Sequence, residues 1–286
     1  MLVSDYTEGK LRGRSGSQGC DMRLTAFAFA LMASLAGCGS QQGRGGTIAE
    51  PIIGFQQASA SVATHGERLT RVLGCRGCHG KELQGERFYE LYASNLTRDL
   101  ANYSDAELSR LLRQGVHPTG RDVWGMPSEL FQYLSGPDED ALITYLRTLK
   151  PAGGPTQPRL PWTPDAEKMI AEGKIKPAAA TVKETMAVAP VDLGPQYALG
   201  RYITQVTCAE CHGSKLQGGD GTPDLIVVAS YSPEEFDKLI TNGIPTGNRK
   251  LHELMVSVAK GRFAFLTTDE RRKLYTYLKA RADQSQ

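Results

Sequence analysis

The chain of 286 residues is short of aromatic side chains, of charge imbalance and of long apolar runs. Aromatic residues make up 7% of it, and the formal net charge is +2. Such a balance gives no reason to expect nucleic acid or a strongly acidic partner. The longest apolar stretch, within residues 22–38, is about a dozen residues, too short to span a bilayer. No alternating run demands a sheet, so the predicted class is all-α.

Cysteine is also scarce, and its distribution leaves little room for a disulfide framework. Four of the six cysteines belong to two copies of C-x-x-C-H, at Cys75–His79 and Cys208–His212. The remaining two are Cys20 and Cys38, so a structural disulfide is possible only if these two pair with each other.

The two C-x-x-C-H motifs predict covalently bound haem. Two thiols one helical turn apart can add to the two vinyl groups of one porphyrin, and the following imidazole then lies under the iron. We therefore expect two haem c groups, attached at Cys75, Cys78, Cys208 and Cys211, with His79 and His212 as proximal iron ligands. The alternative, a zinc or redox C-x-x-C site with an accidental histidine, includes a single zinc bound by all four cysteines.

The segments around the two motifs repeat each other. Cys78-His-Gly-Lys-Glu-Leu-Gln-Gly85 matches Cys211-His-Gly-Ser-Lys-Leu-Gln-Gly218, and Pro118-Thr-Gly120 matches Pro245-Thr-Gly247. Each unit predicts a first helix (62–75 and 196–208), a middle helix after a capping-box serine (104–115 and 232–243), and a last helix (137–149 and 267–282). We infer an old duplication of one unit.

Composition divides the chain around these units. Residues 1–37 form an upstream extension that includes a signal segment at 22–37, and residues 38–60 form a flexible tether. The two units occupy 61–150 and 196–286. Between them, residues 151–195 form a semi-rigid connector rich in proline and alanine, with one short helix expected at 165–172.

These features together resemble class I cytochrome c. The order of haem motif, capped middle helix, ligand loop and final helix implies two tandem domains of that class joined by the connector. More narrowly, Ser94-Asn95-Leu96-Thr97, the following helix and Gly125-Met126-Pro127 are similar to the multihaem cytochrome subunits of bacterial membrane alcohol dehydrogenases. Those subunits usually carry three haem motifs, whereas this chain has two.

Each unit has one methionine placed to be the sixth iron ligand. Met126 lies 47 residues after His79, and Met255 lies 43 after His212, both beyond the Pro-Thr-Gly landmark. A lone methionine is usually core filler, but one per unit at this place favours a thioether ligand. The rival ligands are His117 in the first unit and His252 in the second.

Several polar residues are candidates to bind a haem propionate, with loop surface or core as the alternative. In the first unit they are Arg121, Trp124 and Asn95, and in the second Asn248, Arg249 and Lys250. His65, at the start of the first helix, is expected to be an ordinary surface residue.

The N-terminal segment predicts export and a lipid anchor. Leu35-Ala36-Gly37-Cys38 resembles the lipobox of bacterial lipoproteins, which implies acylation of Cys38. A simple secretory signal or an uncleaved anchor is the alternative. We expect a location on the periplasmic side of a bacterial membrane, with the outer membrane slightly favoured because Gly39 is not aspartate.

With both axial positions filled, such a protein is expected to carry electrons and not to act as an enzyme itself. The expected partners are a periplasmic or membrane-bound dehydrogenase, a terminal oxidase or another cytochrome, and the membrane surface. The alternative is a dihaem peroxidase or sulfur-compound dehydrogenase with an open or displaceable sixth position at the second haem, or a dedicated subunit of a larger dehydrogenase.

Overall fold

The computed structural model describes residues 53–59, 61–219 and 221–284. The expected signal segment at 22–37, Cys20, Cys38 and the tether up to residue 52 lie outside these residues. Within them the fold is mostly helical, 56% helix and 3% strand, which confirms the helical class. No helix of the described part is both long and apolar enough to cross a membrane.

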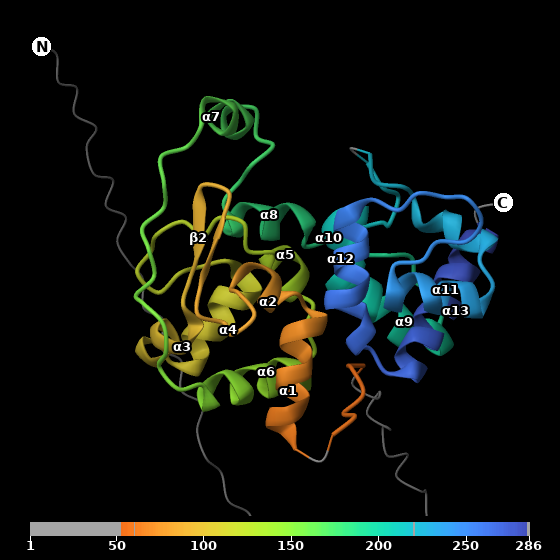
Figure 1. Cartoon of the computed structure of the whole chain (residues 1–286), viewed down its shortest axis with the longest axis horizontal. Coiled ribbons are helices and arrows are strands. Elements are labelled where there is room, and N and C mark those ends of the chain that lie inside the picture. Colours follow the sequence, from red (N-terminus) through yellow and green to blue (C-terminus); the bar gives the residue numbers. More distant parts are fainter. Residues whose placement is uncertain (1–52, 60, 220, 285–286) are drawn as a thin grey trace, which may run out of the picture. The chain divides into compact units, whose positions relative to one another are not determined.

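The first half consists of short helices around one small hairpin (Figure 1). In chain order these elements are α1 (Val62–Val72), α2 (Cys75–Cys78), β1 (Glu86–Phe88), β2 (Leu91–Ala93), α3 (Leu96–Asp99), η1 (Leu100–Asn102), α4 (Asp105–Gln114), α5 (Ser128–Phe131) and α6 (Gly136–Thr148). The sequence does not predict the antiparallel hairpin. Each strand has only three residues, and burial does not alternate along either of them, so no alternating pattern marks them.

The second half follows nearly the same order of helices. Its elements are η2 (Pro195–Tyr197), α9 (Ala198–Ile203), the π-helix η3 (Thr204–Cys208), α10 (Ala209–His212), η4 (Leu225–Ser230), α11 (Pro233–Asn242), α12 (Glu253–Gly261), η5 (Phe263–Phe265) and α13 (Thr268–Gln284). The helix α12 has no long counterpart in the first half, where the four-residue α5 stands in the ligand loop.

Local capping explains where the middle helices, α4 and α11, begin and end. The Ser104 hydroxyl accepts from the Glu107 amide, and the Glu107 carboxylate accepts from the Ser104 amide, a complete capping box. Ser232 and Glu235 form the same box at α11. Both helices end at a glycine with positive φ, Gly115 and Gly243.

In both halves the first helix crosses the last one at a glycine. A Cβ atom on Gly66 would lie 1.9 Å from the Ala141 carbonyl oxygen, and one on Gly200 would lie 2.3 Å from the Lys273 carbonyl oxygen. Only a residue without a side chain permits this approach, which brings the backbones of α1 and α6, and of α9 and α13, into contact.

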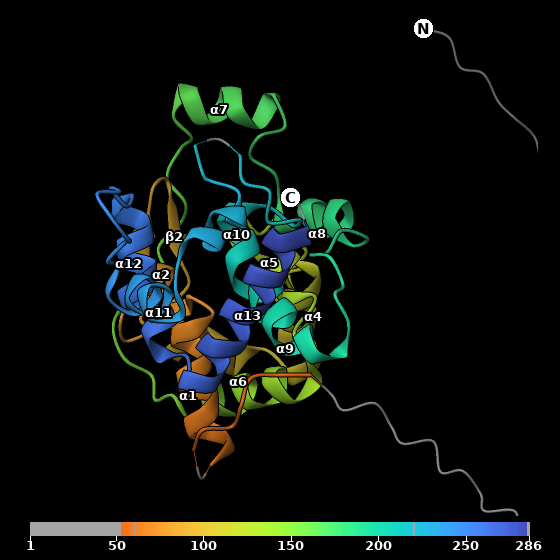
Figure 2. The ribbon, with the colours of Figure 1, turned by 90° about the vertical axis from the view of Figure 1, so that its right-hand side faces the viewer.

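The connector lies against the first half. Two helices, α7 (Pro164–Ala171) and α8 (Ala178–Thr185), form within it; the sequence predicts the first but not the second. The Ala178 amide donates to the Val123 carbonyl at 2.8 Å, and the Tyr133 hydroxyl donates to the Thr185 carbonyl at 2.6 Å. In Figures 1 and 2, α7 stands apart from the other helices while α8 lies near α5. The helix α8 thus anchors the connector to the first half.

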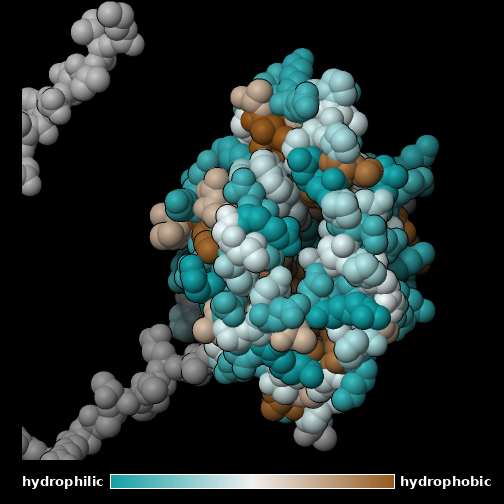
Figure 3. All heavy atoms as spheres, turned by 90° about the vertical axis from the view of Figure 1, so that its left-hand side faces the viewer, coloured by the Kyte–Doolittle hydropathy of each residue, from teal (hydrophilic) through white to brown (hydrophobic). Residues whose placement is uncertain are grey.

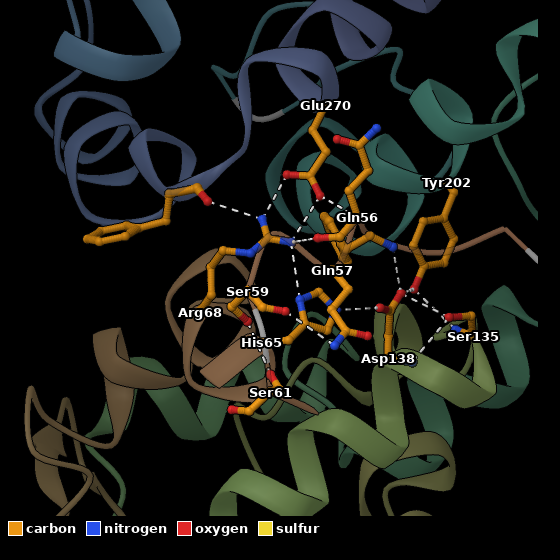
Figure 4. A network of polar contacts seen from close by, with 12 residues as sticks. Gln56, Gln57, Ser59, Ser61, His65, Arg68, Ser135, Asp138, Tyr202 and Glu270 are labelled. Carbon is orange, nitrogen blue, oxygen red and sulfur yellow. Dashed lines mark hydrogen bonds and ion pairs between the residues drawn. The ribbon is translucent and has the colours of Figure 1, made fainter. Parts of the chain in front are cut away.

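A buried polar network joins the two halves (Figure 4). Arg68 of α1 contacts Glu270 of α13 at 2.8 and 3.0 Å, and the Tyr202 hydroxyl of α9 donates to Asp138 of α6 at 2.7 Å. Asp138 and Glu270 are 1% and 0% exposed. Since a buried carboxylate needs partners, each half supplies the partner for the other half's acid.

These two contacts relate equivalent positions of the repeat. Arg68 and Tyr202 each lie two residues after the crossing glycine, Gly66 or Gly200. Asp138 and Glu270 each lie three residues after the residue that caps the last helix, Ser135 and Thr267, respectively. The halves therefore make reciprocal contacts, as in an isologous interface between two copies.

The same network corrects two expectations. His65 is not a surface residue: it is 4% exposed, and its Nε2 lies 3.4 Å from Asp138 Oδ1. The end of the tether is not loose either, because the amides of Phe55 and Gln56 donate to Asp138 and Glu270 at 2.9 and 2.8 Å. Both differences arise because two buried carboxylates attract donors from segments distant in sequence.

Candidate haem sites

The helix α2 presents the first motif at the end of α1. Gly74 has φ 82°, which ends α1 and turns the chain into the short helix that carries Cys75 and Cys78. His79 follows at once. Its Nδ1 lies 2.8 Å from the Ser94 carbonyl oxygen. Because a carbonyl only accepts, Nδ1 carries the proton and Nε2 keeps its lone pair, the tautomer that a metal ligand requires.

A cavity of about 660 Å³ extends beside this motif. It is within the size range of cofactor pockets. Its lining combines the two cysteines, the histidine and the methionine of the first site with apolar side chains, which suits a porphyrin with apolar faces: Cys75, Cys78, His79, Met126, Leu73, Leu96, Leu100, Leu108, Leu112, Phe131, Leu142 and Leu146. The residues present therefore fit a covalently bound haem.

The segment around Met126 forms another part of the cavity wall. Gly125 has φ 72°, the Ser128 amide donates to the Met126 carbonyl at 2.8 Å, and the Ser128 hydroxyl donates to the Leu111 carbonyl of α4 at 3.0 Å. These bonds fix the loop on the middle helix. Met126 is half-buried and lines the cavity together with His79.

The rival ligand His117 also lines this cavity, but both of its ring nitrogens have other partners. Its Nδ1 accepts from the Thr119 amide at 3.2 Å, and its Nε2 lies 3.2 Å from the Tyr103 hydroxyl. Burial is the main cause that lowers the pKa of His117. In the neutral ring with Nδ1 as acceptor, Nε2 carries the proton, so no lone pair is left for iron. This arrangement favours Met126.

The candidate propionate residues of the first half divide into two groups. Arg121 and Trp124 line the cavity. Asn95 does not: it is 1% exposed, and its amide nitrogen donates to the carbonyls of Ala152 and Gly154 at 2.8 and 2.7 Å. Asn95 therefore fixes the start of the connector.

The sequence reasoning missed the part of the connector that lines the same cavity. Thr156, Gln157, Pro158 and Arg159 belong to its wall. The Arg159 guanidinium lies 4.3 Å from the centre of the Trp162 ring, which in turn packs edge to face with Trp124. Arg121 and Arg159 thus place two cations at the cavity, where an acidic group would be stabilised. The signal for this was an arginine and a tryptophan in an otherwise proline-rich stretch.

The second motif begins on a continuous helix. Here no glycine separates the first helix from the cysteines; α9 continues through the π-helix η3 to Cys208, and α10 carries Cys211 and His212. The His212 Nδ1 lies 2.9 Å from the Pro223 carbonyl oxygen, so Nε2 again keeps its lone pair. Cys208 is buried, whereas Cys211 is exposed.

Met255, the predicted sixth ligand of the second site, lies in the first turn of α12. It is half-buried and packs against the core. His252 is the N-cap of this helix, and its Nδ1 accepts from the Leu254 amide at 3.2 Å. Arg249 is exposed, donates to Ser230 and lies 5.2 Å from the centre of the Tyr231 ring. Asn248 and Lys250 are exposed.

The cysteine geometry gives no support to a zinc site. Among the described residues no group of three or more His, Cys, Asp or Glu side chains is arranged to hold a metal ion.

The comparison with known families agrees with the second site. Residues 195–278 match the family model described as cytochrome C oxidase, cbb3-type, subunit III. None of the curated proteins matches the chain. The family match includes the second motif and Met255. It supports a cytochrome c domain over these residues, and such a domain implies covalently bound haem c and electron transfer.

Proposed function

We propose that the protein is a dihaem c-type cytochrome, two tandem class I domains at 61–150 and 196–286, which carries electrons between a periplasmic or membrane-bound dehydrogenase and a terminal acceptor. The observation that carries this proposal is the repeated histidine geometry. In both motifs Nδ1 donates to a backbone carbonyl, so that Nε2 keeps its lone pair for a metal. Haem iron supplies one-electron oxidation and reduction when bound.

The chain's own residues hold, orient and insulate the two groups. The cysteines would hold each porphyrin by thioether bonds. His79 with Met126, and His212 with Met255, would be the iron ligands. A soft thioether ligand stabilises ferrous iron and raises the reduction potential. The leucines around the first cavity keep water from that haem, while Arg121 and Arg159 are placed to pair with its propionates.

The test is a haem count in the protein and in two double variants. Intact mass should show two haems, and C75A/C78A and C208A/C211A should each retain one. Both variants remove two thiols and differ only in the half affected, so each is the control for the other. A mass without haem, or with a single haem in the unsubstituted protein, would overturn the proposal.

A second candidate is an enzyme that uses the second haem as an open site. The observation that favours it is the exposure of Cys211, together with Leu254 and Ile244 at 58% and 55% exposed. Absorbance distinguishes the two functions. A fully low-spin ferric spectrum with the methionine–iron band supports the carrier, whereas a high-spin fraction that binds cyanide and turns over peroxide supports the enzyme.

We further propose that Cys38 is acylated and holds the protein at the periplasmic side of a bacterial membrane. Two or more acyl chains are enough for stable anchoring. The protein should then fractionate with membranes, and C38S should release it in soluble form with both haems intact. C20S is the matched control and should not change the distribution. A soluble unsubstituted protein would contradict the anchor.

A further inference from the structure

One arginine connects the two haem motifs. Arg262 follows α12, and its Nε donates to the Val72 carbonyl at the end of α1, at 3.1 Å. Its Nη1 donates to Glu210 at 2.6 Å, and Glu210 stands between the two cysteines of the second motif. A single side chain thus holds the helix end before Cys75 and the helix that bears Cys211.

The first motif is shaped to receive this guanidinium. A Cβ atom on Gly74, the residue before Cys75, would lie 2.8 Å from Cζ of Arg262. Glu210 of the second motif also belongs to the wall of the first cavity, together with Cys75 and Cys78. The cysteine-bearing sides of the two sites therefore adjoin.

Arg262 is largely shielded from solvent. Its side chain is 14% exposed, and its Nη2 is buried without a hydrogen-bond partner. A shielded charge acts over longer distances than one in water.

We propose that Arg262 is a positioning residue that holds the two haem sites with their cysteine-bearing edges side by side, so that the haems exchange electrons directly. This inference rests on the proposed dihaem function. One electron moves in each exchange: the iron that gives it is oxidised, the iron that takes it is reduced, and no bond or proton changes place. Because the Arg262 cation lies beside both C-x-x-C-H motifs, it would raise the reduction potential of a haem bound at either one.

The test is a spectroelectrochemical titration of the full chain carrying both haems. R262Q should lower both midpoint potentials, because it removes the cation and leaves Glu210 unpaired. E210Q should raise both, because it removes the anion and leaves Arg262. R271Q is the matched control: Arg271 also pairs with an acid, Asp237, and a backbone carbonyl, that of Leu266, and should leave both potentials unchanged.

The outcomes separate this inference from the function on which it rests. A haem count below two in the unsubstituted protein contradicts the function. Two haems with neither potential changed, or with only one changed, in R262Q and E210Q overturn the role of Arg262. If R262Q does not fold, the midpoint potentials of E210Q alone decide the role of Arg262. A loss of thermal stability in R262Q without a change in either potential would show that Arg262 is purely structural.

Discussion

The two halves share one plan but enclose their sites to different degrees. In the first half, the hairpin, the loop around Met126 and residues 156–159 of the connector all contribute to a cavity of about 660 Å³. In the second half, Cys211 is exposed and the methionine lies on a regular helix, α12. The same motif can therefore serve haems of different solvent access, and solvent access is one of the factors that set reduction potential.

Exposed apolar side chains occur in both halves. Figure 3 views the face that carries β2, α3 and the connector, and there hydrophobic residues are scattered among hydrophilic ones. In the hairpin of the first half, Phe88 and Tyr89 are 39% and 75% exposed, and in the second half Ile244 and Leu254 are 55% and 58% exposed. Since electron-transfer partners dock through small interfaces, the exposed Cys211 leads us to expect them at the second haem.

The largest expected effect is the loss of an axial methionine. M126L and M255L should each convert one haem to the high-spin form, because leucine has no donor atom. The haem in M255L should bind cyanide faster than the one in M126L, since its site is more exposed. Absorbance and stopped-flow cyanide binding measure this.

Two further variants control this comparison. M169L changes an exposed methionine of the connector and should alter neither haem. H252A combined with M255L should resemble M255L alone, because His252 caps α12 through Nδ1. A low-spin M255L that becomes high-spin only in the double variant would show that His252 replaces the methionine.

The reciprocal contacts between the halves predict unequal losses of stability. R68M leaves Glu270, which is fully buried, without its cation and should lower the free energy of unfolding by about 3–5 kcal/mol. Y202F removes the hydrogen bond to Asp138, which keeps its other donors, and the one that the hydroxyl accepts from the Ser135 amide. It should cost about 1.5–3 kcal/mol.

An exposed ion pair is the control for these two variants. Arg272 and Asp269 lie three residues apart at the surface of α13, and R272M should cost less than about 1 kcal/mol. Urea unfolding followed by circular dichroism gives all three values. Equal losses for R68M and R272M would contradict the role of Arg68 as the partner of a buried charge.

The loss of stability on replacing a crossing glycine should be larger where the added Cβ atom lies closer to the backbone of the last helix. G66A places a Cβ atom 1.9 Å from a carbonyl oxygen, and G200A places one at 2.3 Å. Both should lower stability by about 1–3 kcal/mol, with the larger loss at Gly66. At Gly136, nothing lies within 4 Å of an added Cβ, so G136A should change stability by less than about 0.5 kcal/mol. Thermal unfolding of the three variants measures the order.

The sequence predicts those structural features that depend on residues close together in the chain. The capping serines, the glycines that end helices and the spacing of C-x-x-C-H are local patterns, and they predict α4, α6, α11 and α13 to within two residues. The attachment residues and the axial ligands remain predictions, which the hydrogen bonds of His79, His212 and His117 favour.

The contacts between distant segments could not be predicted in the same way. Nothing near Arg68 in the sequence indicates that its partner is Glu270, 202 residues away, or that Tyr202 reaches Asp138. The prediction for His65 was wrong for the same reason. A histidine at the start of a helix is usually exposed, and its contact with Asp138 cannot be seen in the local sequence. Aligning the two repeats would have shown that Arg68 and Tyr202 are equivalent.

The smallest expected effect concerns the two capping boxes at low pH. Hydrogen bonds from the Ser104 amide and hydroxyl lower the pKa of Glu107, and those from the Ser232 amide and from Thr246 lower that of Glu235. A carboxyl whose pKa is lower in the folded state stabilises the fold above its unfolded pKa, about 4.3, and loses this contribution as the pH falls through the folded pKa. E107Q and E235Q should each unfold at lower urea concentration than the unsubstituted protein at pH 7, and the difference should shrink below about pH 4. Because Glu235 also accepts from Thr246, the stability difference should change more steeply with pH for E235Q than for E107Q. Equal slopes for the two variants would show that the hydrogen bond from Thr246 contributes nothing.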